Sequence, residues 1–193
     1  MILVWLILIP LAAGLVAGLI ARKSPVGSRV ISLLAMVAGF AISLWFWLAN
    51  YGHIALWHQR VWLVEFNRPW ITDFGIRFHL AMDGLSLLLI TLTFLLGIAS
   101  VLISWREIDH AIGFFHFNLL WIVAGIVGVF LAMDLFLFYF AWELMLIPMY
   151  FLIAIWGHER RIYAAVKFFL FTQLSGLLIS QFSLDRLIAV AGR

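Results

Sequence analysis

Long apolar runs separated by short polar stretches dominate the pattern of this 193-residue chain. A helix needs ~20 mostly apolar residues to cross a bilayer. Six runs come close to or exceed that length: Ile2–Ala21, Val30–Leu48, Leu80–Ser104, Phe114–Met133, Leu135–Trp156 and Ile162–Leu184. The pattern therefore predicts an all-α fold, a polytopic membrane helical bundle of about six transmembrane helices.

The charges beside the runs predict how the helices are oriented. Arg22 and Lys23 follow the first run and no basic residue precedes it, which is the reverse of a signal peptide, so we expect a retained helix. The turns on one side hold more basic residues than the loop on the other side, and the richer side of a membrane protein usually faces the cytoplasm. Both termini are then expected outside. The richer side holds Arg22, Lys23, Arg29, Arg106, Arg160, Arg161 and Lys167, and the poorer side Arg60, Arg68 and Arg77.

The outer loop 49–79 is the one sizeable segment between the runs. Hydrophobic alternation in Trp57–Phe66 and Ile76–Phe78 predicts short strands or a hairpin at the membrane interface. Tryptophans concentrate at headgroup level in membrane proteins, but aromatic side chains are also enriched in protein interfaces. We therefore expect an aromatic belt here, with a docking surface for another subunit as the alternative. The tryptophans are Trp57, Trp62 and Trp70.

Composition supports a membrane protein and excludes several other functions. The chain is 66% hydrophobic and 11% charged, whereas soluble domains are about 25% charged. The net charge of +3 is spread over short turns and forms no basic face, so we expect no nucleic-acid partner. There is no cysteine for a disulfide or a thiolate metal site, and the histidines are scattered, so no metal or cofactor is expected in this chain.

Glu143 is the most informative residue because it lies near the middle of the apolar run Leu135–Trp156. A charge at the centre of a membrane helix costs at least ~2.5–3.5 kcal/mol and often marks a proton or ion pathway. Asp134 lies at the start of the run, where it can reach the interface. The sequence thus predicts that Glu143 relays protons. The alternative is a protonated side chain hydrogen-bonded to a neighbouring helix.

Two neighbours of Glu143 favour a functional helix. Pro148 has no N–H, so it leaves the Leu144 carbonyl without its helical donor, and in a membrane that carbonyl must find water or a side chain. Trp142 is expected to shape access to the carboxylate. The alternative for Pro148 is a simple packing kink.

The last apolar run carries polar side chains that could face Glu143. Thr172, Gln173 and Ser175 lie within about one helical turn of one another. We expect them to support the relay, with ordinary interhelical hydrogen bonding as the alternative.

Several segments resemble one family of membrane subunits. The sequence W-E-L-M-L-I-P-M-Y at 142–150 is the most specific. Over about residues 1–177 the chain resembles subunit M, the chain 4 type, of the proton-pumping NADH:quinone oxidoreductase, respiratory complex I. The other matching segments are Leu80–Ser86, Phe117–Trp121, Gly128–Asp134, Trp142–Ile153, Ala154–His158 and Lys167–Phe169.

The resemblance implies a function and a domain organisation. The glutamate of the fifth helix in such subunits is an essential proton-channel residue, and Glu143 matches it. Its partner in the family is a lysine on a seventh helix, whereas this sequence ends after its sixth, so we expect a truncated version. The expected parts are three introductory transmembrane helices in 1–104, the first three helices of the antiporter-like repeat in 105–184, and a divergent tail in 185–193.

The resemblance also implies partners and a location. The chain is expected to join other membrane subunits in the lipid bilayer of a bacterial plasma membrane, with the mitochondrial inner membrane as the alternative. It would carry protons while NAD, FMN, iron–sulfur clusters and quinone bind in other subunits, and it would hold no redox centre itself. The alternative functions are a subunit of an Mrp-type cation/proton antiporter and a non-functional truncated fragment.

Overall fold

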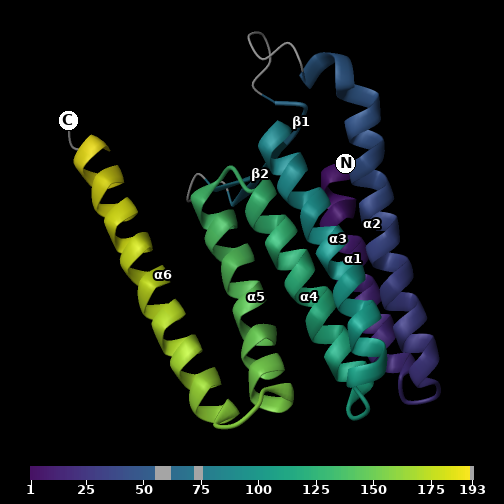
Figure 1. The fold of residues 1–193 in the computed structure, drawn as a ribbon. Coiled ribbons are helices and arrows are strands. Elements are labelled where there is room, and N and C mark those ends of the chain that lie inside the picture. Colours follow the sequence, from purple (N-terminus) through teal and green to yellow (C-terminus); the bar gives the residue numbers. More distant parts are fainter. Residues whose placement is uncertain (55–61, 72–75, 192–193) are drawn as a thin grey trace. The chain divides into compact units, whose positions relative to one another are not determined.

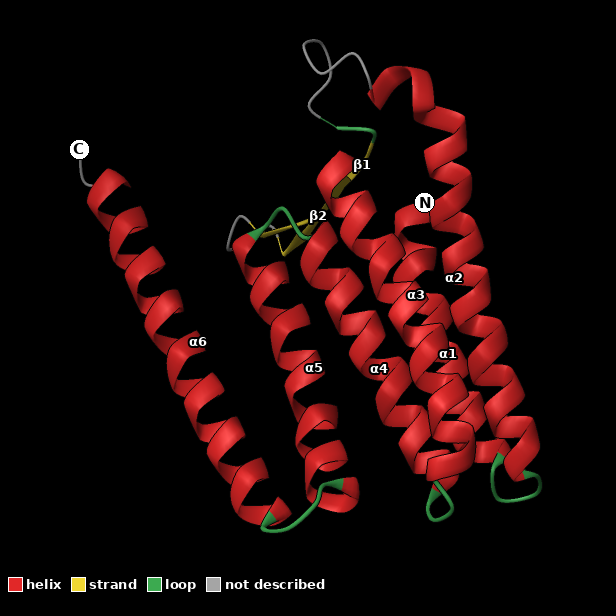
Figure 2. Cartoon of the chain, viewed as in Figure 1, coloured by secondary structure: helices red, strands yellow, loops and turns green. Residues whose placement is uncertain are grey.

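Helices occupy all six of the predicted runs in the computed structural model, which describes residues 1–54, 62–71 and 76–191 (Figures 1 and 2). Among these residues, α1 to α5 are long and apolar enough to cross a membrane. The predicted helical membrane fold is therefore confirmed. The elements are α1 (Ile2–Ile20), α2 (Pro25–Ile54), β1 (Val64–Ile71), β2 (Ile76–Met82), α3 (Gly84–Glu107), α4 (Ile112–Leu131), α5 (Leu135–Trp156) and α6 (Arg161–Ala191).

The third helix begins later than the apolar run predicts. The run starts at Leu80, but Leu80–Met82 forms the end of strand β2, and α3 begins at Gly84. Asp83 caps the helix, because its side chain accepts a hydrogen bond of 2.7 Å from the backbone N–H of Ser86. The apolar run includes the strand end because its three residues are all apolar, and a short apolar run cannot be told from a buried helix segment by its pattern. In the structure these three residues are buried.

Helices α1 to α4 pack into a bundle (Figure 1). Helix α1 packs against α2 and α4, and α3 packs against α2 and α4. Fully buried side chains fill the space between them, including Leu6, Met36, Phe94 and Leu120. Glycine permits the closest approach, since a Cβ on Gly39 of α2 would overlap the ring of Phe94 on α3.

The loop between α2 and α3 contains the predicted hairpin. Strands β1 and β2 are antiparallel, with Val64 paired to Met82 and an irregularity between Pro69 and Ile71. The backbone N–H of Met133, after α4, donates to the carbonyl of His79 at 3.0 Å, which fixes the hairpin to the end of the bundle. The predicted hairpin is thus confirmed, but its strands lie further along the chain than predicted. Residues 64–66 and 76–78 are in β1 and β2 as expected, the strands continue to Ile71 and Met82, and residues 62 and 63 come before β1. The earlier part of the predicted first strand, including Trp57, lies outside the described residues.

The hairpin presents aromatic side chains near the start of α5. The ring of Trp70 packs edge-on against Phe136 of α5, with centroids 6.1 Å apart, and against Phe78 at 5.9 Å. Trp70 is 46% exposed, and Trp62 is half-buried. An aromatic belt and a docking surface would both leave Trp70 exposed, so both stay predictions.

The chain consists of two compact units, Met1–Pro148 and Met149–Arg193. The first contains α1 to α4, the hairpin and the beginning of α5. The second contains the end of α5 and α6, which contact each other through Tyr150 and Phe169, with ring centroids 5.9 Å apart. Each unit is described here by itself. The predicted boundary between introductory helices and repeat, near residue 104, stays a prediction.

Candidate functional site

Glu143 lies in the first unit, near the middle of α5. At 1.5 Å per residue it is about 12 Å from the start of the helix and about 20 Å from its end. It is the only Asp, Glu, Lys or Arg in α5, and its side chain is half-buried. The structure therefore places Glu143 near the middle of its helix, as the apolar run predicts.

Asp134 serves the end of the helix rather than its middle. Its carboxylate accepts hydrogen bonds from the backbone N–H groups of Phe136 at 2.8 Å and Leu137 at 3.4 Å. These donors belong to the first turn of α5, where they have no partner within the helix, so Asp134 acts as an N-cap. The prediction that Asp134 lies outside the membrane centre agrees with this position.

Helix α4 packs closely against one side of α5. A Cβ on Gly125 would lie 2.8 Å from the Cβ of Met145, and one on Gly128 would lie 3.0 Å from the Cβ of Ala141. Ala141 and Met145 are one turn apart and share a face. Glu143 lies midway between them and is rotated by about 200° from each, at 3.6 residues per turn. The carboxyl group is therefore on the side of α5 away from α4.

The neighbours of Glu143 on α5 are aromatic. The phenol of Tyr139, one turn earlier, is within hydrogen-bonding reach of the carboxylate. Trp142 stacks on Phe138 with ring centroids 6.1 Å apart. The indole nitrogen of Trp142 is buried and has no hydrogen-bond acceptor among the described residues, although a buried indole N–H usually has one.

Pro148 lies within α5, as the sequence predicts, and is buried. The ring removes the donor to the Leu144 carbonyl, which is next to Glu143 along the chain. A polar acceptor is thus released one residue from the carboxyl group. Whether this acceptor contributes to a relay or only accompanies a kink stays a prediction.

The predicted polar partners lie on α6, in the second unit. The hydroxyl of Thr172 donates to the carbonyl of Phe168 at 2.8 Å, and that of Ser175 donates to Phe171 at 2.9 Å. Both protons are therefore used within their own helix, and the oxygens keep lone pairs that can accept. Gln173 is half-buried. The proximity of these three residues to Glu143 stays a prediction.

Sequence reasoning gave no role to His116, although it is the most deeply buried titratable side chain in the described α4. It is fully buried, and neither ring nitrogen has a hydrogen-bond partner among the described residues. Arg29 of α2 is near enough to interact with it electrostatically. The guanidinium of Arg29 donates to the Ile108 carbonyl at 2.8 Å and lies over the ring of Trp105. The only local signal is a polar residue inside the apolar run Phe114–Met133.

Metal binding finds no support in the part of the chain that is described. No group of three His, Cys, Asp or Glu side chains in it could hold a metal ion. The site is thus a carboxyl group on a membrane helix, surrounded by aromatic side chains. A carboxyl group can exchange protons, and the long apolar helices define the chain as a helical membrane protein.

Comparison with known proteins identifies the family. A family model described as "NADH:quinone oxidoreductase/Mrp antiporter, TM" matches residues 132–184, which include Glu143. The chain is 53% identical over 187 residues to NADH-quinone oxidoreductase subunit M of Pseudomonas aeruginosa, covering 93% of this chain and 37% of that protein. The chain therefore belongs to the family of membrane subunits shared by NADH:quinone oxidoreductases and Mrp antiporters, and its sequence is similar to members named subunit M.

Solved structures agree with this assignment. A chain of respiratory complex I from Thermus thermophilus is 25% identical, with a TM-score of 0.73 over 91% of this chain and 33% of that one. A chain of the Mrp complex from Dietzia has a TM-score of 0.74 at 19% identity, covering 92% of this chain and 18% of that one, and this shows the fold alone. The chain spans a little over a third of the length of the Pseudomonas relative.

Proposed function

We propose that this chain is a membrane component of an NADH:quinone oxidoreductase and that Glu143 relays protons within it. One observation carries the proposal: the single acidic residue of α5 lies at mid-helix, in the segment matched by the family model. The high identity to a protein named NADH-quinone oxidoreductase subunit M supports the choice of complex. The multi-pass fold and the bacterial relatives agree with a location in the inner membrane.

The relay requires that Glu143 gain a proton from one side and release it toward the other. Because α4 closes one side of α5, protons reach the carboxyl group along the opposite side. Tyr139 can exchange a hydrogen bond with the carboxylate as it titrates. In this proposal Trp142 restricts access, and the carbonyl released by Pro148 accepts a hydrogen bond from water on the path.

The remaining parts of the proposal concern the assembly. Residues 1–104 would be introductory helices, 105–184 would begin the antiporter-like repeat, and 185–193 would form the tail. Thr172, Gln173 and Ser175 would line the path from the α6 side. Other membrane subunits would be the partners, and NAD, FMN, iron–sulfur clusters and quinone would bind in subunits other than this one.

The test is Glu143→Gln in the host's own gene, followed by assays on inverted membrane vesicles. Glutamine keeps the shape and the hydrogen bonding of the side chain but cannot exchange a proton. NADH-driven acidification, measured with a pH-sensitive dye, should fall to a small fraction of wild type, and Glu143→Asp should retain part of it. Glu159→Gln is the matched control, because Glu159 is exposed in the turn between α5 and α6.

Two controls make the result interpretable. Immunoblots of the membranes must show equal amounts of the chain, and native gels must show equal amounts of the assembled complex. If the Gln variant is assembled and pumps at the wild-type rate, the relay role of Glu143 is wrong.

The second candidate function is an Mrp-type cation/proton antiporter subunit. The family model and the fold of the Dietzia complex favour it. Vesicles energised without NADH distinguish the two functions. Sodium-induced proton release that depends on Glu143, together with unchanged NADH-driven pumping, would favour the antiporter.

A further inference from the structure

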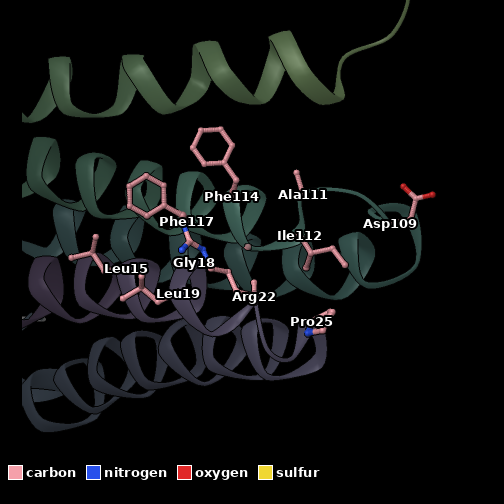
Figure 3. Close-up of a pocket in the computed structure, with 12 residues that line it drawn as sticks. Leu15, Gly18, Leu19, Arg22, Pro25, Asp109, Ala111, Ile112, Phe114 and Phe117 are labelled. Atoms are coloured by element: carbon pink, nitrogen blue, oxygen red, sulfur yellow. The ribbon is translucent and has the colours of Figure 1, made fainter.

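A groove lies between the end of α1 and the start of α4, next to the α1–α2 and α3–α4 turns (Figure 3). Its volume is about 670 Å³, within the range of ~300–1,000 Å³ that is typical of small-molecule sites. It belongs to the first unit and is remote in sequence from Glu143. Its lining is Leu15, Gly18, Leu19, Ala21, Arg22, Pro25, Asp109, Ala111, Ile112, Gly113, Phe114 and Phe117.

The groove exists because small residues let α1 and α4 approach closely, and their side chains are too short to fill the space beside the contact. A Cβ on Gly113 would overlap that of Ala21 and lie 3.0 Å from the carbonyl oxygen of Gly18. Gly14 and Gly18 are four residues apart, the small-residue spacing that lets membrane helices approach closely. A Cβ on Gly14 would lie 3.3 Å from the Cβ of Leu120 on α4.

The walls of the groove are apolar and open to the surroundings. Leu15 is 51% exposed, Leu19 is 67% exposed and Phe114 is 39% exposed. Leu15 lies five residues before the end of α1, about 8 Å deeper in the membrane at 1.5 Å per residue. This part of the groove has the chemistry of a site for acyl chains.

Two charges of opposite sign line the groove. Arg22 extends from the end of α1, and Figure 3 shows its side chain running along the groove toward Gly18 and Phe117. Asp109 is contributed by the α3–α4 turn. A hydrogen bond of 3.0 Å with the ring of His110 holds the pKa of Asp109 below its usual value, so the carboxylate is charged at neutral pH.

The turn that carries Asp109 is held in place. The side chain of Arg29 donates a hydrogen bond of 2.8 Å to the carbonyl of Ile108, the residue before Asp109, and lies over the ring of Trp105. Arg29 of α2 therefore fixes the turn that contributes Asp109 to the groove. Such a pair of opposite charges suits a ligand whose headgroup carries both signs.

We propose that this groove binds one phosphatidylethanolamine molecule. The lipid phosphate would contact Arg22, the ammonium group would donate to Asp109, and an acyl chain would lie along Leu15, Leu19 and Phe114.

Other headgroups satisfy the two charges less well. A phosphatidylglycerol headgroup supplies no cation for Asp109 and brings its negative charge near that carboxylate. A choline headgroup has a cation but no N–H to donate to Asp109. Ethanolamine supplies both a positive charge and hydrogen-bond donors, and this predicts an order of affinity.

The test uses the full chain in detergent and native mass spectrometry with added lipids of identical acyl chains. Wild type should retain one phosphatidylethanolamine more tightly than phosphatidylglycerol or phosphatidylcholine. Because each variant removes one charge-assisted contact, Arg22→Gln and Asp109→Asn should each weaken retention of the ethanolamine lipid about tenfold. Arg22→Gln should weaken all three lipids, whereas Asp109→Asn should remove the preference for ethanolamine over glycerol.

Two neighbouring charges give matched controls. Lys23→Gln and Glu107→Gln change exposed charges of the same turns that do not line the groove, so they should leave the order of affinity unchanged. Thermal unfolding of each variant shows whether the fold is retained. Glycerophosphoethanolamine, which has no acyl chains, should not displace the lipid.

Three results would overturn the proposal. The first is that phosphatidylglycerol binds wild type as tightly as phosphatidylethanolamine, which would indicate a general anionic-lipid surface. The second is that the control variants weaken retention as much as the two groove variants. The third is that wild type retains none of the three lipids more tightly than the Arg22→Gln variant does. None of these results bears on the relay role of Glu143.

Discussion

Replacing Gly113 by alanine should weaken the contact between α1 and α4. The added methyl group would overlap the Cβ of Ala21 and lie 3.0 Å from the Gly18 carbonyl oxygen. Since that oxygen belongs to the backbone, one helix must move. Overpacking costs ~1–3 kcal/mol, whereas alanine gains at most ~1 kcal/mol in helix propensity, so we expect a net loss of up to about 2 kcal/mol.

The assay is thermal unfolding of the full chain in detergent, followed by the fluorescence of its ten tryptophans. For a chain of this size the Tm changes by ~2–4 °C per kcal/mol, so Gly113→Ala should lower it by up to about 8 °C. Gly84→Ala is the matched control, because a Cβ there meets nothing within 4 Å, and its Tm should stay equal or rise.

A double variant separates the overlap from other effects. Adding Ala21→Gly to Gly113→Ala removes the nearest clashing atom, so it should restore part of the lost stability, measured as a coupling between the two sites. Full rescue is not expected, because the Gly18 carbonyl still opposes the new methyl group. An unchanged or higher Tm for Gly113→Ala alone would refute the close packing of α1 and α4.

Two further predictions concern burial and orientation. Each unsatisfied buried polar group costs ~1–3 kcal/mol, so His116→Leu should leave the Tm equal or raise it; a clear fall would show that the ring has a partner such as bound water. Cysteines introduced at the exposed Lys23 and Asn67 test the orientation in this cysteine-free chain. A membrane-impermeant thiol reagent added outside should label the site at 67 and spare the site at 23, and the reverse pattern would invert the predicted topology.

The sequence was sufficient for the helices because their signal is local. An apolar run such as Leu135–Trp156 can satisfy its backbone inside a bilayer only as a helix or as part of a closed barrel, and the structure has helix α5 with the same bounds. The strand Ile76–Met82 was predicted only in its first half. Its buried end has no polar alternation, and its pairing with Val64–Ile71 depends on contacts between distant residues.

The candidate site was predictable in part for the same reason. The depth of Glu143 follows from counting along one helix, but the side it occupies does not. That side is defined by Gly125 and Gly128 on α4, whose missing side chains admit Ala141 and Met145. The burial of His116 likewise depends on how α4 packs within the bundle, which a polar residue inside an apolar run does not by itself reveal.

The position of Glu143 relative to α4 restricts how a relay could operate. Water cannot pass between α4 and α5 at the level of the carboxyl group, since Gly125 and Gly128 leave no space there. The side of α5 that carries Glu143 also carries Tyr139 one turn earlier and Ile147, which is 57% exposed, one turn later. Helix α4 therefore closes one side of α5 without supplying the path. If Glu143 relays protons as proposed, the path must therefore run on the side of α5 away from α4.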